Sequence, residues 1–278
     1  MAATNEARKQ KFSATLCSRS DTSLQLSCSL DPSLKYRSGS QIARVVTEKW
    51  FESNMYCPAC ESQTLGPTPN NFPGIDFTCP SCALAVQLKS RRTPLSNRIV
   101  DAGYDAMLRA IRAEQAPNLF LLRYTPSFSI SDMLLIPSFF FTESVVEKRK
   151  PLSPTARRAG WVGCNILLSH IPEDGRIPVI CSGVPAAPEH VRAEYKRIRP
   201  LGKIDARMRG WTLDVLNVLR RTGKQNLSLS DFYGFESYLQ KLHPDNKNVR
   251  PKIRQQAQVL RDLGYLSFEG NGRYRVLR

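Results

Sequence analysis

Four of the eight cysteines form two C-x-x-C pairs, and their spacing predicts a structural zinc site. The pairs are Cys57 with Cys60 and Cys79 with Cys82, with residues 61–78 between them. Thiolates spaced in this way can bind one tetrahedral Zn²⁺ ion from a single turn of chain, and two such turns complete its coordination. Because a closed four-cysteine site leaves no open position, this zinc is expected to be structural. The alternative interpretation is four ordinary buried thiols.

A second group of residues, around the second cysteine pair, has the pattern of a metal-dependent nuclease core. Asp76 lies just before that pair, and Gln87-Leu88-Lys89 follows it. The gap allows Asp76 to lie on one strand and Gln87 and Lys89 on the next strand, where a separation of two residues puts both on one face. The side-chain oxygens of Asp76 and Gln87, helped by the Leu88 carbonyl, could coordinate Mg²⁺, a hard cation that prefers oxygen ligands.

The chemistry expected of such a site is hydrolysis of a phosphodiester. The metal would polarise the phosphoryl oxygen and generate the nucleophile, and Lys89 would lie near the attacking water and favour its deprotonated form. Taken alone the pattern is weak, and the alternative is a surface strand with solvated polar side chains. Glu48 is a further carboxylate on a predicted helix, and we interpret it as a solvated helix residue.

Two other segments carry residues that are suited to contact with DNA. The helix predicted over residues 249–263 has arginine and glutamine on its polar faces, and these pair well with guanine and adenine in the major groove. The alternative for this helix is a solvated charged face. Trp161 lies in a basic loop rather than in an apolar run, although a core position is the alternative. The residues expected to bind DNA are Arg157, Arg158, Trp161, Lys252, Arg254, Gln255, Gln256, Arg273 and Arg275.

These residues need a scaffold, and the hydrophobic pattern predicts an α/β domain for the first part of the chain. Residues 40–51 have the 3.6-residue period of a helix with Ser40 as its N-cap, and residues 102–113 predict a second helix that Asp101 caps. Strands alternating with helices are typical of an α/β layer. They are expected over residues 84–89, 119–124, 133–136 and 177–180.

The last ninety residues predict a winged helix. Helices are expected over residues 211–219, 232–242 and 249–263, and two alternating segments around Gly270-Asn271-Gly272 predict a β-hairpin. Three helices followed by a hairpin is the order of a winged helix. The expected divisions are an N-terminal mobile arm (1–38) with a short ordered stretch near residues 24–30, a nuclease domain (39–183) with a zinc ribbon (57–82), a linker (184–205) and a winged-helix domain (206–278).

Charge and composition limit the classes of protein that this chain can represent. Lys and Arg number 40 against 24 Asp and Glu, and the formal net charge of +16 favours a polyanion such as nucleic acid as partner. The longest apolar run is too short to cross a membrane, and the N-terminus lacks the apolar segment of a signal peptide. We therefore expect a cytoplasmic protein, monomeric, with reduced thiols.

Several segments from about residue 40 to the end resemble the DpnI family of methyl-directed restriction endonucleases. The longest similar segment is Pro151-Leu-Ser-Pro-Thr-Ala-Arg-Arg-Ala-Gly-Trp-Val-Gly-Cys-Asn-Ile166. Further similar segments are Tyr56-Cys-Pro-Ala-Cys60, Gln87-Leu-Lys-Ser90, Asp101-Ala-Gly-Tyr104 and the helix from Lys252 to Asp262. The resemblance implies a nuclease core of the PD-(D/E)xK type with an inserted four-cysteine zinc site, followed by a winged helix.

The same resemblance implies an activity and a substrate. It implies double-strand cleavage of DNA at GATC, only where the adenine carries an N6-methyl group, with both domains recognising methylated sites. The Trp161 indole could pack against that methyl group, although burial of one methyl contributes only about 0.8 kcal/mol. Gln87 stands where the family pattern has Glu, and an amide lacks the negative charge of a carboxylate. The rival hypothesis is therefore a zinc-containing winged-helix regulator that reads DNA without cutting it.

Overall fold

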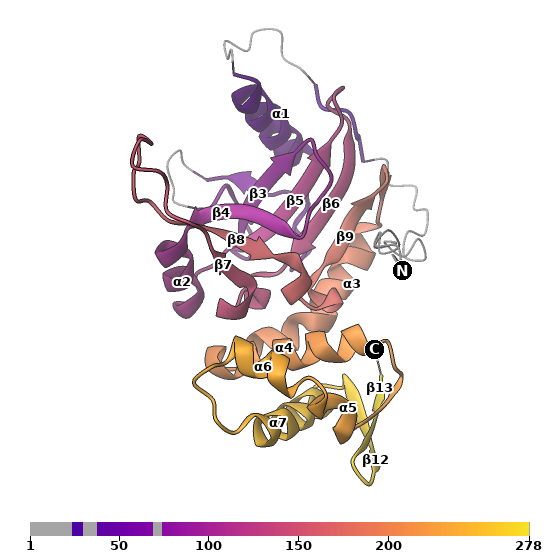
Figure 1. The fold of residues 1–278 in the computed structure, drawn as a ribbon. Coiled ribbons are helices and arrows are strands. Elements are labelled where there is room, and N and C mark those ends of the chain that lie inside the picture. Colours follow the sequence, from indigo (N-terminus) through magenta and orange to yellow (C-terminus); the bar gives the residue numbers. More distant parts are fainter. Residues whose placement is uncertain (1–23, 30–37, 69–73, 278) are drawn as a thin grey trace, which may run out of the picture.

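The computed structural model describes residues 24–29, 38–68 and 74–277, which form a larger α/β part and a smaller C-terminal part (Figure 1). The first part contains α1 (Gly39–Asn54), β1 (Gly66–Pro67), β2 (Phe77–Thr78), β3 (Ala85–Arg91), β4 (Arg98–Gly103), α2 (Tyr104–Arg112), β5 (Asn118–Tyr124), β6 (Ile130–Ile136), β7 (Val146–Lys148), β8 (Gly163–Leu167), β9 (Ile177–Cys181), β10 (Val184–Pro185) and α3 (Pro188–Ile198). The second contains α4 (Ala206–Thr222), β11 (Asn226–Ser228), α5 (Leu229–Tyr233), α6 (Glu236–Leu242), α7 (Val249–Asp262), β12 (Leu266–Gly270) and β13 (Arg273–Val276). Short 3₁₀ turns are η2 (Ser138–Phe140), η3 (Glu143–Val145), η4 (Leu168–His170), η5 (Glu173–Gly175) and η6 (Arg199–Lys203).

The main sheet has seven strands in the order β1-β2-β3-β5-β6-β9-β10. β3 and β5 pair in parallel, whereas β2 and β3 are antiparallel neighbours. The middle strand β5 is a nearly continuous apolar run, as expected of a strand that is buried on both faces. α1 packs on β3, where the Thr47 hydroxyl donates to Ser90 Oγ at 2.9 Å, and the Phe51 ring contacts Phe77 and Phe120. This packing fixes the strand that carries Gln87 and Lys89.

A second sheet of three antiparallel strands has the order β4-β8-β7. α2 contacts all three strands, and its buried side chains are Met107, Leu108 and Ile111. Residues 149–162 connect β7 to β8 and project away from the sheet (Figure 1). This small sheet therefore carries two residues singled out in the sequence, Asp101 on β4 and Trp161 in the projecting loop.

The C-terminal part has the helices and the hairpin predicted for a winged helix. The buried face of α7 contains Ile253, Ala257 and Leu260, and α7 packs against α4. β12 and β13 form the hairpin, and β11 joins β13 as a third strand that the sequence pattern did not predict. The expected helix over residues 232–242 is divided into α5 and α6. A capping box between Ser228 and Asp231 sets the start of α5.

Polar contacts made by α4 fasten the two parts together, and Figure 1 shows this helix along their boundary. The Asp174 carboxylate, 4% exposed, accepts from Arg220 of α4 at 2.7 Å and from Arg197 of α3 at 3.2 Å. The Ser144 hydroxyl donates to the buried Asp214 of α4 at 2.9 Å. Two separate sets of polar contacts therefore join α4 to the α/β part.

The expected linker over residues 184–205 is instead folded. It contains β10, α3 and η6, and α3 packs against β9 of the main sheet. Val191, Tyr195 and Ile198 are the buried residues of α3, at the spacing of one helix face. An amphipathic pattern was thus present in the segment that was expected to be a linker.

The short ordered stretch that was expected near residues 24–30 of the arm is present. Residues 24–29 lie against the α/β part: the Trp50 indole N–H donates to the Gln25 carbonyl at 2.6 Å, and the Ile130 N–H donates to the Leu26 carbonyl at 2.8 Å. Residues 1–23 and 30–37 lie outside the described residues, so the rest of that expectation stays a prediction.

Two helix caps were predicted at the wrong residues. Ser38, not Ser40, is at the N-cap position of α1, because the helix begins one residue earlier, at Gly39. α2 begins at Tyr104 with Gly103 as its N-cap, so Asp101 is not a capping residue. Asp101 lies on β4, and its carboxylate has a different partner, described below.

Candidate functional site

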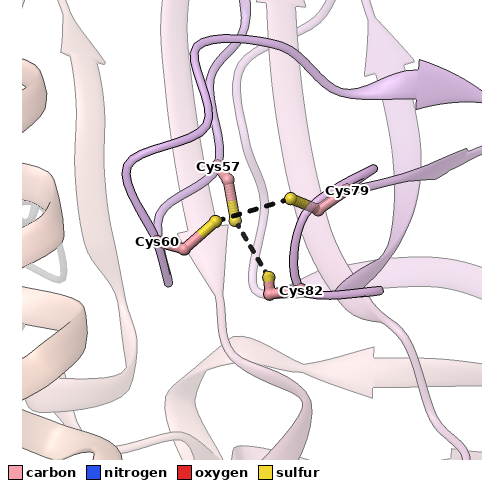
Figure 2. Close-up of side chains that lie close together, drawn as sticks. All are labelled: Cys57, Cys60, Cys79 and Cys82. Atoms are coloured by element: carbon pink, nitrogen blue, oxygen red, sulfur yellow. Dashed lines mark hydrogen bonds between the residues drawn. The ribbon is translucent and has the colours of Figure 1, made fainter.

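The four predicted zinc ligands come together from two loops. Figure 2 shows the sulfur atoms of all four cysteines pointing toward one another. The Sγ atoms of Cys57 and Cys82 are 3.6 Å apart, those of Cys60 and Cys79 are 3.5 Å apart, and all four lie within 4.8 Å of one another. A tetrahedral ion with Zn–S bonds of about 2.3 Å separates its ligands by roughly 3.8 Å. The cysteine cluster is confirmed and fits a zinc ion.

Backbone groups favour the thiolate form that a metal requires. Burial opposes ionisation of Cys79, but N–H groups of Cys82 and Ser81 donate to its sulfur and, with the neighbouring thiols, lower the pKa of Cys79 to about 6. Burial acts in the same direction at Cys57, where it outweighs the hydrogen bond from Ala59 and raises the pKa. Because a metal ligand must be deprotonated, the N–H donors around Cys79 favour the form that binds metal.

α3 supports the first cysteine loop from the segment that was expected to be a linker. Arg192 donates from Nε to the Cys57 carbonyl at 3.1 Å and from Nη2 to the Ser62 carbonyl at 3.1 Å. Its guanidinium lies over the Tyr56 ring, 5.1 Å from the centroid. The folded zinc loop and α3 therefore hold each other in place, a contact between distant segments that spacing along the chain does not reveal.

Asp76 lies beside β3, the strand that carries Gln87, where β2 pairs with it. The Leu88 N–H donates to Asp76 Oδ2 at 2.8 Å, and the Asp76 N–H donates to the Val86 carbonyl at 2.8 Å. Among the residues that the structure describes, none donates to the second Asp76 oxygen or bonds to the Gln87 side-chain amide. The Asp76 carboxylate thus lies against the strand that carries Gln87, and carboxylate and amide oxygens are ligands that suit Mg²⁺. Their role as metal ligands, with Leu88, stays a prediction.

Lys89 has a partner that sequence reasoning missed. Its Nζ lies 2.7 Å from Oδ1 of Asp101, and the two side chains are 25% and 4% exposed. The two residues come from different sheets, so their contact depends on how β3 and β4 meet. Glu48, by contrast, pairs with Arg44 four residues away on α1 at 2.7 Å, which agrees with a partly solvated helix residue.

Trp161 lies on two glycines of the small sheet. A Cβ atom added to Gly163 would lie 2.8 Å from the Trp161 ring, and one added to Gly103 would lie 3.4 Å from its Nε1. The Arg158 guanidinium lies over the same indole, 4.6 Å from the centroid. The indole is half-buried, and Arg157 beside it is exposed. Trp161 is therefore a supported side chain in an exposed loop, and its DNA contact stays a prediction.

The predicted DNA-reading face of α7 is only partly available to a ligand. Arg254 and Gln255 are exposed and Lys252 is half-buried, and Lys252 Nζ donates to Gln255 Oε1 at 2.8 Å. Arg254 donates to the Tyr233 hydroxyl and lies over that ring. On the hairpin, both Arg273 and Arg275 are exposed. These residues keep their expected place on the surface.

Gln256 is the exception, and its assignment to base reading is wrong. Its side chain is fully buried, and its Oε1 accepts a hydrogen bond from Thr212 of α4 at 2.6 Å. Position 256 falls on the same helix face as Ile253 and Leu260, so the helical period places it in the core. The glutamine joins α7 to α4 and does not face solvent.

Replacing Gln256 with alanine is expected to lower the free energy of unfolding by about 1–3 kcal/mol, because it removes the buried hydrogen bond between α7 and α4 and leaves a cavity in the core. Gln255→Ala is the matched control, and an exposed substitution of this kind is expected to change stability by less than about 0.5 kcal/mol. Urea denaturation followed by circular dichroism measures both. Equal midpoints for the two variants would contradict the assignment.

Fold and site together define a class: an α/β domain with a four-cysteine cluster, joined to a C-terminal helix-turn-helix domain of the kind that binds DNA. None of the helices in the described segments is both long and apolar enough to span a membrane. The family model of DpnI, the Dam-replacing family, matches residues 24–204, and the Dam-replacing HTH domain matches residues 207–276.

The chain therefore belongs to the DpnI, Dam-replacing family, as its motifs had indicated. The match begins at residue 24 rather than near residue 40, which agrees with the packing of residues 24–29 on the α/β part. Because DpnI is a nuclease family, hydrolytic cleavage of nucleic acid becomes the chemistry to test at Asp76, Gln87 and Lys89.

Proposed function

We propose that this protein is a Mg²⁺-dependent type II restriction endonuclease that makes double-strand cuts in DNA at GATC sites whose adenine carries an N6-methyl group. The observation that carries the proposal is the hydrogen bond from the N–H of Leu88, which lies between Gln87 and Lys89 on β3, to the Asp76 carboxylate in a chain from a nuclease family. We assign the α/β part to the PD-(D/E)xK type on the same residues.

Each of these residues has a defined task in the proposed reaction. The second Asp76 oxygen, the Gln87 amide oxygen and the Leu88 carbonyl would hold Mg²⁺. When bound, the metal supplies charge neutralisation at the phosphate and makes water more acidic. The Lys89 ammonium orients the attacking water and stabilises the negative charge that develops on the phosphate.

The DNA would be held by both parts of the chain. Arg157 and Arg158 supply positive charge beside Trp161, whose indole packs against the methylated adenine. One methyl group contributes only about 0.8 kcal/mol, so a strong preference requires a second reading of the site. Lys252, Arg254 and Gln255 on α7 are suited to that reading in the major groove, while Arg273 and Arg275 neutralise phosphates. Zn²⁺ is structural in this proposal, and the protein acts as a monomer.

The purified protein with Mg²⁺ is expected to digest plasmid from an adenine-methylating host and to spare the same plasmid prepared without methylation. Fragment sizes would correspond to the GATC sites of the plasmid, and a plasmid in which one GATC is altered loses the matching cut. Gel electrophoresis over an enzyme titration measures the preference. Equal digestion of both plasmids, or digestion unrelated to GATC, would contradict the proposed specificity.

Gln87 favours one alternative function, that of a non-cleaving DNA-binding regulator. An amide at this position leaves the predicted metal site with one negative charge fewer than a glutamate would give. A nicking assay across Mg²⁺ and Mn²⁺ concentrations separates the two functions. Methyl-dependent binding without nicking under either metal would support the regulator.

A further inference from the structure

Asp101 is aimed at Lys89 by an irregularity in the small sheet. β4 and β8 pair in regular register through Val100 opposite Asn165, and the next pair is Gly103 opposite Gly163. Two residues of β4 therefore face one residue of β8, which is a β-bulge, and Asp101 lies in it. Bulges redirect side chains and are frequent beside active sites. Here the redirected carboxylate is almost fully buried and reaches the ammonium of Lys89 in the other sheet.

The contact matters because of what Lys89 would otherwise pair with. Asp76 is bonded to the N–H of Leu88, the residue next to Lys89 on β3, so its carboxylate is the alternative anion at this strand pair. Gln87 is neutral, which leaves Asp76 as the charged member of the proposed ligand set. A lysine that neutralised Asp76 would remove the charge on which metal binding depends.

We propose that Asp101 is a positioning residue that holds the Lys89 ammonium and thereby keeps the second Asp76 oxygen available to the metal. This inference rests on the proposed nuclease function. Gln87 stands where the family pattern has Glu, but the proposed site still contains two carboxylates with separate tasks. Asp76 binds the metal, and Asp101 holds the lysine.

The test compares Asp101→Asn with Asp105→Asn. Asp105 lies in the first turn of α2 and is exposed, so the control removes the same charge four residues away. Single-turnover cleavage of a methylated duplex is measured over a Mg²⁺ titration. Asp101→Asn is expected to cleave about 10–100-fold more slowly and to need more Mg²⁺, as for other residues that orient metal-site groups. Its affinity for the same duplex in Ca²⁺ should stay within about twofold of the parent protein. Asp105→Asn should match the parent in each measurement.

A second readout does not depend on cleavage. Acylation of Lys89 by an N-hydroxysuccinimide ester, followed by peptide mass spectrometry, reports how firmly the amine is held against the carboxylate. Lys89 is expected to react several-fold faster in Asp101→Asn than in the parent protein. Asp101→Glu keeps the charge on a longer side chain, so it should restore much of the protection and part of the cleavage rate. This variant also serves if Asp101→Asn fails to fold.

The outcomes separate the two proposals. Unchanged cleavage or unchanged Lys89 acylation in Asp101→Asn would overturn the role of Asp101. If Lys89 in Asp101→Glu is acylated as fast as is expected for Asp101→Asn, that result would also overturn the role of Asp101. If the parent protein does not cut methylated DNA, the proposed function fails, and the acylation rates still decide whether Asp101 holds Lys89.

Discussion

Lys89→Ala is expected to abolish measurable cleavage of methylated DNA while leaving its binding intact. The ammonium is the one cationic group among the proposed catalytic residues, and loss of one such stabilising group costs about 10²–10³-fold in rate. Single-turnover cleavage and fluorescence anisotropy with the same duplex measure the two properties. Lys49→Ala is the matched control, because Lys49 is an exposed lysine on α1, the helix that packs on β3.

The Lys89→Ala variant is also expected to be less stable than the parent protein. Removing Lys89 leaves the buried Asp101 carboxylate without its cation, and an uncompensated buried charge destabilises a fold by about 3–5 kcal/mol at most. The double variant Lys89→Ala with Asp101→Asn removes that charge, so its melting temperature should exceed that of Lys89→Ala. It should remain inactive. Cleavage retained by either lysine variant would move the catalytic centre elsewhere.

The second large effect is expected at the cysteine cluster. Cys57→Ser should lose bound zinc and most of the cooperative unfolding of the α/β part. Structural zinc contributes about 10–16 kcal/mol to the folding of small zinc-finger peptides, and here the Cys57 loop also receives two hydrogen bonds from Arg192 of α3. The loss is therefore transmitted to a helix that contacts the main sheet.

Mass spectrometry of bound metal and differential scanning calorimetry measure both consequences. The parent protein is expected to carry one zinc per chain. Cys181→Ser is the control, since Cys181 lies on β9 outside the cluster. This variant should retain the zinc, and its melting temperature should be close to that of the parent protein. A melting temperature for Cys57→Ser that equals that of the control would contradict a structural role for the metal.

Features with a local signature could be predicted from the sequence. Two C-x-x-C pairs are sufficient for the cysteine cluster, because each pair lies within one turn. The period of two along β3 places Gln87 and Lys89 on one face, and the order of helices and hairpin predicts the winged helix. Gln256 shows that a polar residue type alone does not place a side chain on the exposed face of a helix. It follows Ile253 by three residues, and this helical spacing predicts a core position.

Features that depend on contacts between distant segments could not be predicted in this way. Asp101 looked like a helix cap because it precedes a helical pattern, and only the bulge between β4 and β8 turns it toward Lys89. Arg192 looked like one more basic residue of a linker, and its bonds to the Cys57 loop depend on the packing of α3. In both cases the residue contacts a different helix, strand or loop, and the distance along the chain between the two partners follows no helix or strand period.

The two polar contacts between α4 and the α/β part have a consequence for motion of the C-terminal part. A rotation of the C-terminal part relative to the α/β part would have to break both the Arg220–Asp174 ion pair and the Ser144–Asp214 hydrogen bond. Hydrogen bonds to charged groups contribute about 1.5–3 kcal/mol each, so the two contacts together oppose such a rotation. The projecting loop 149–162 and the β12–β13 hairpin take no part in these contacts, so we expect adjustment to a bound ligand to occur there.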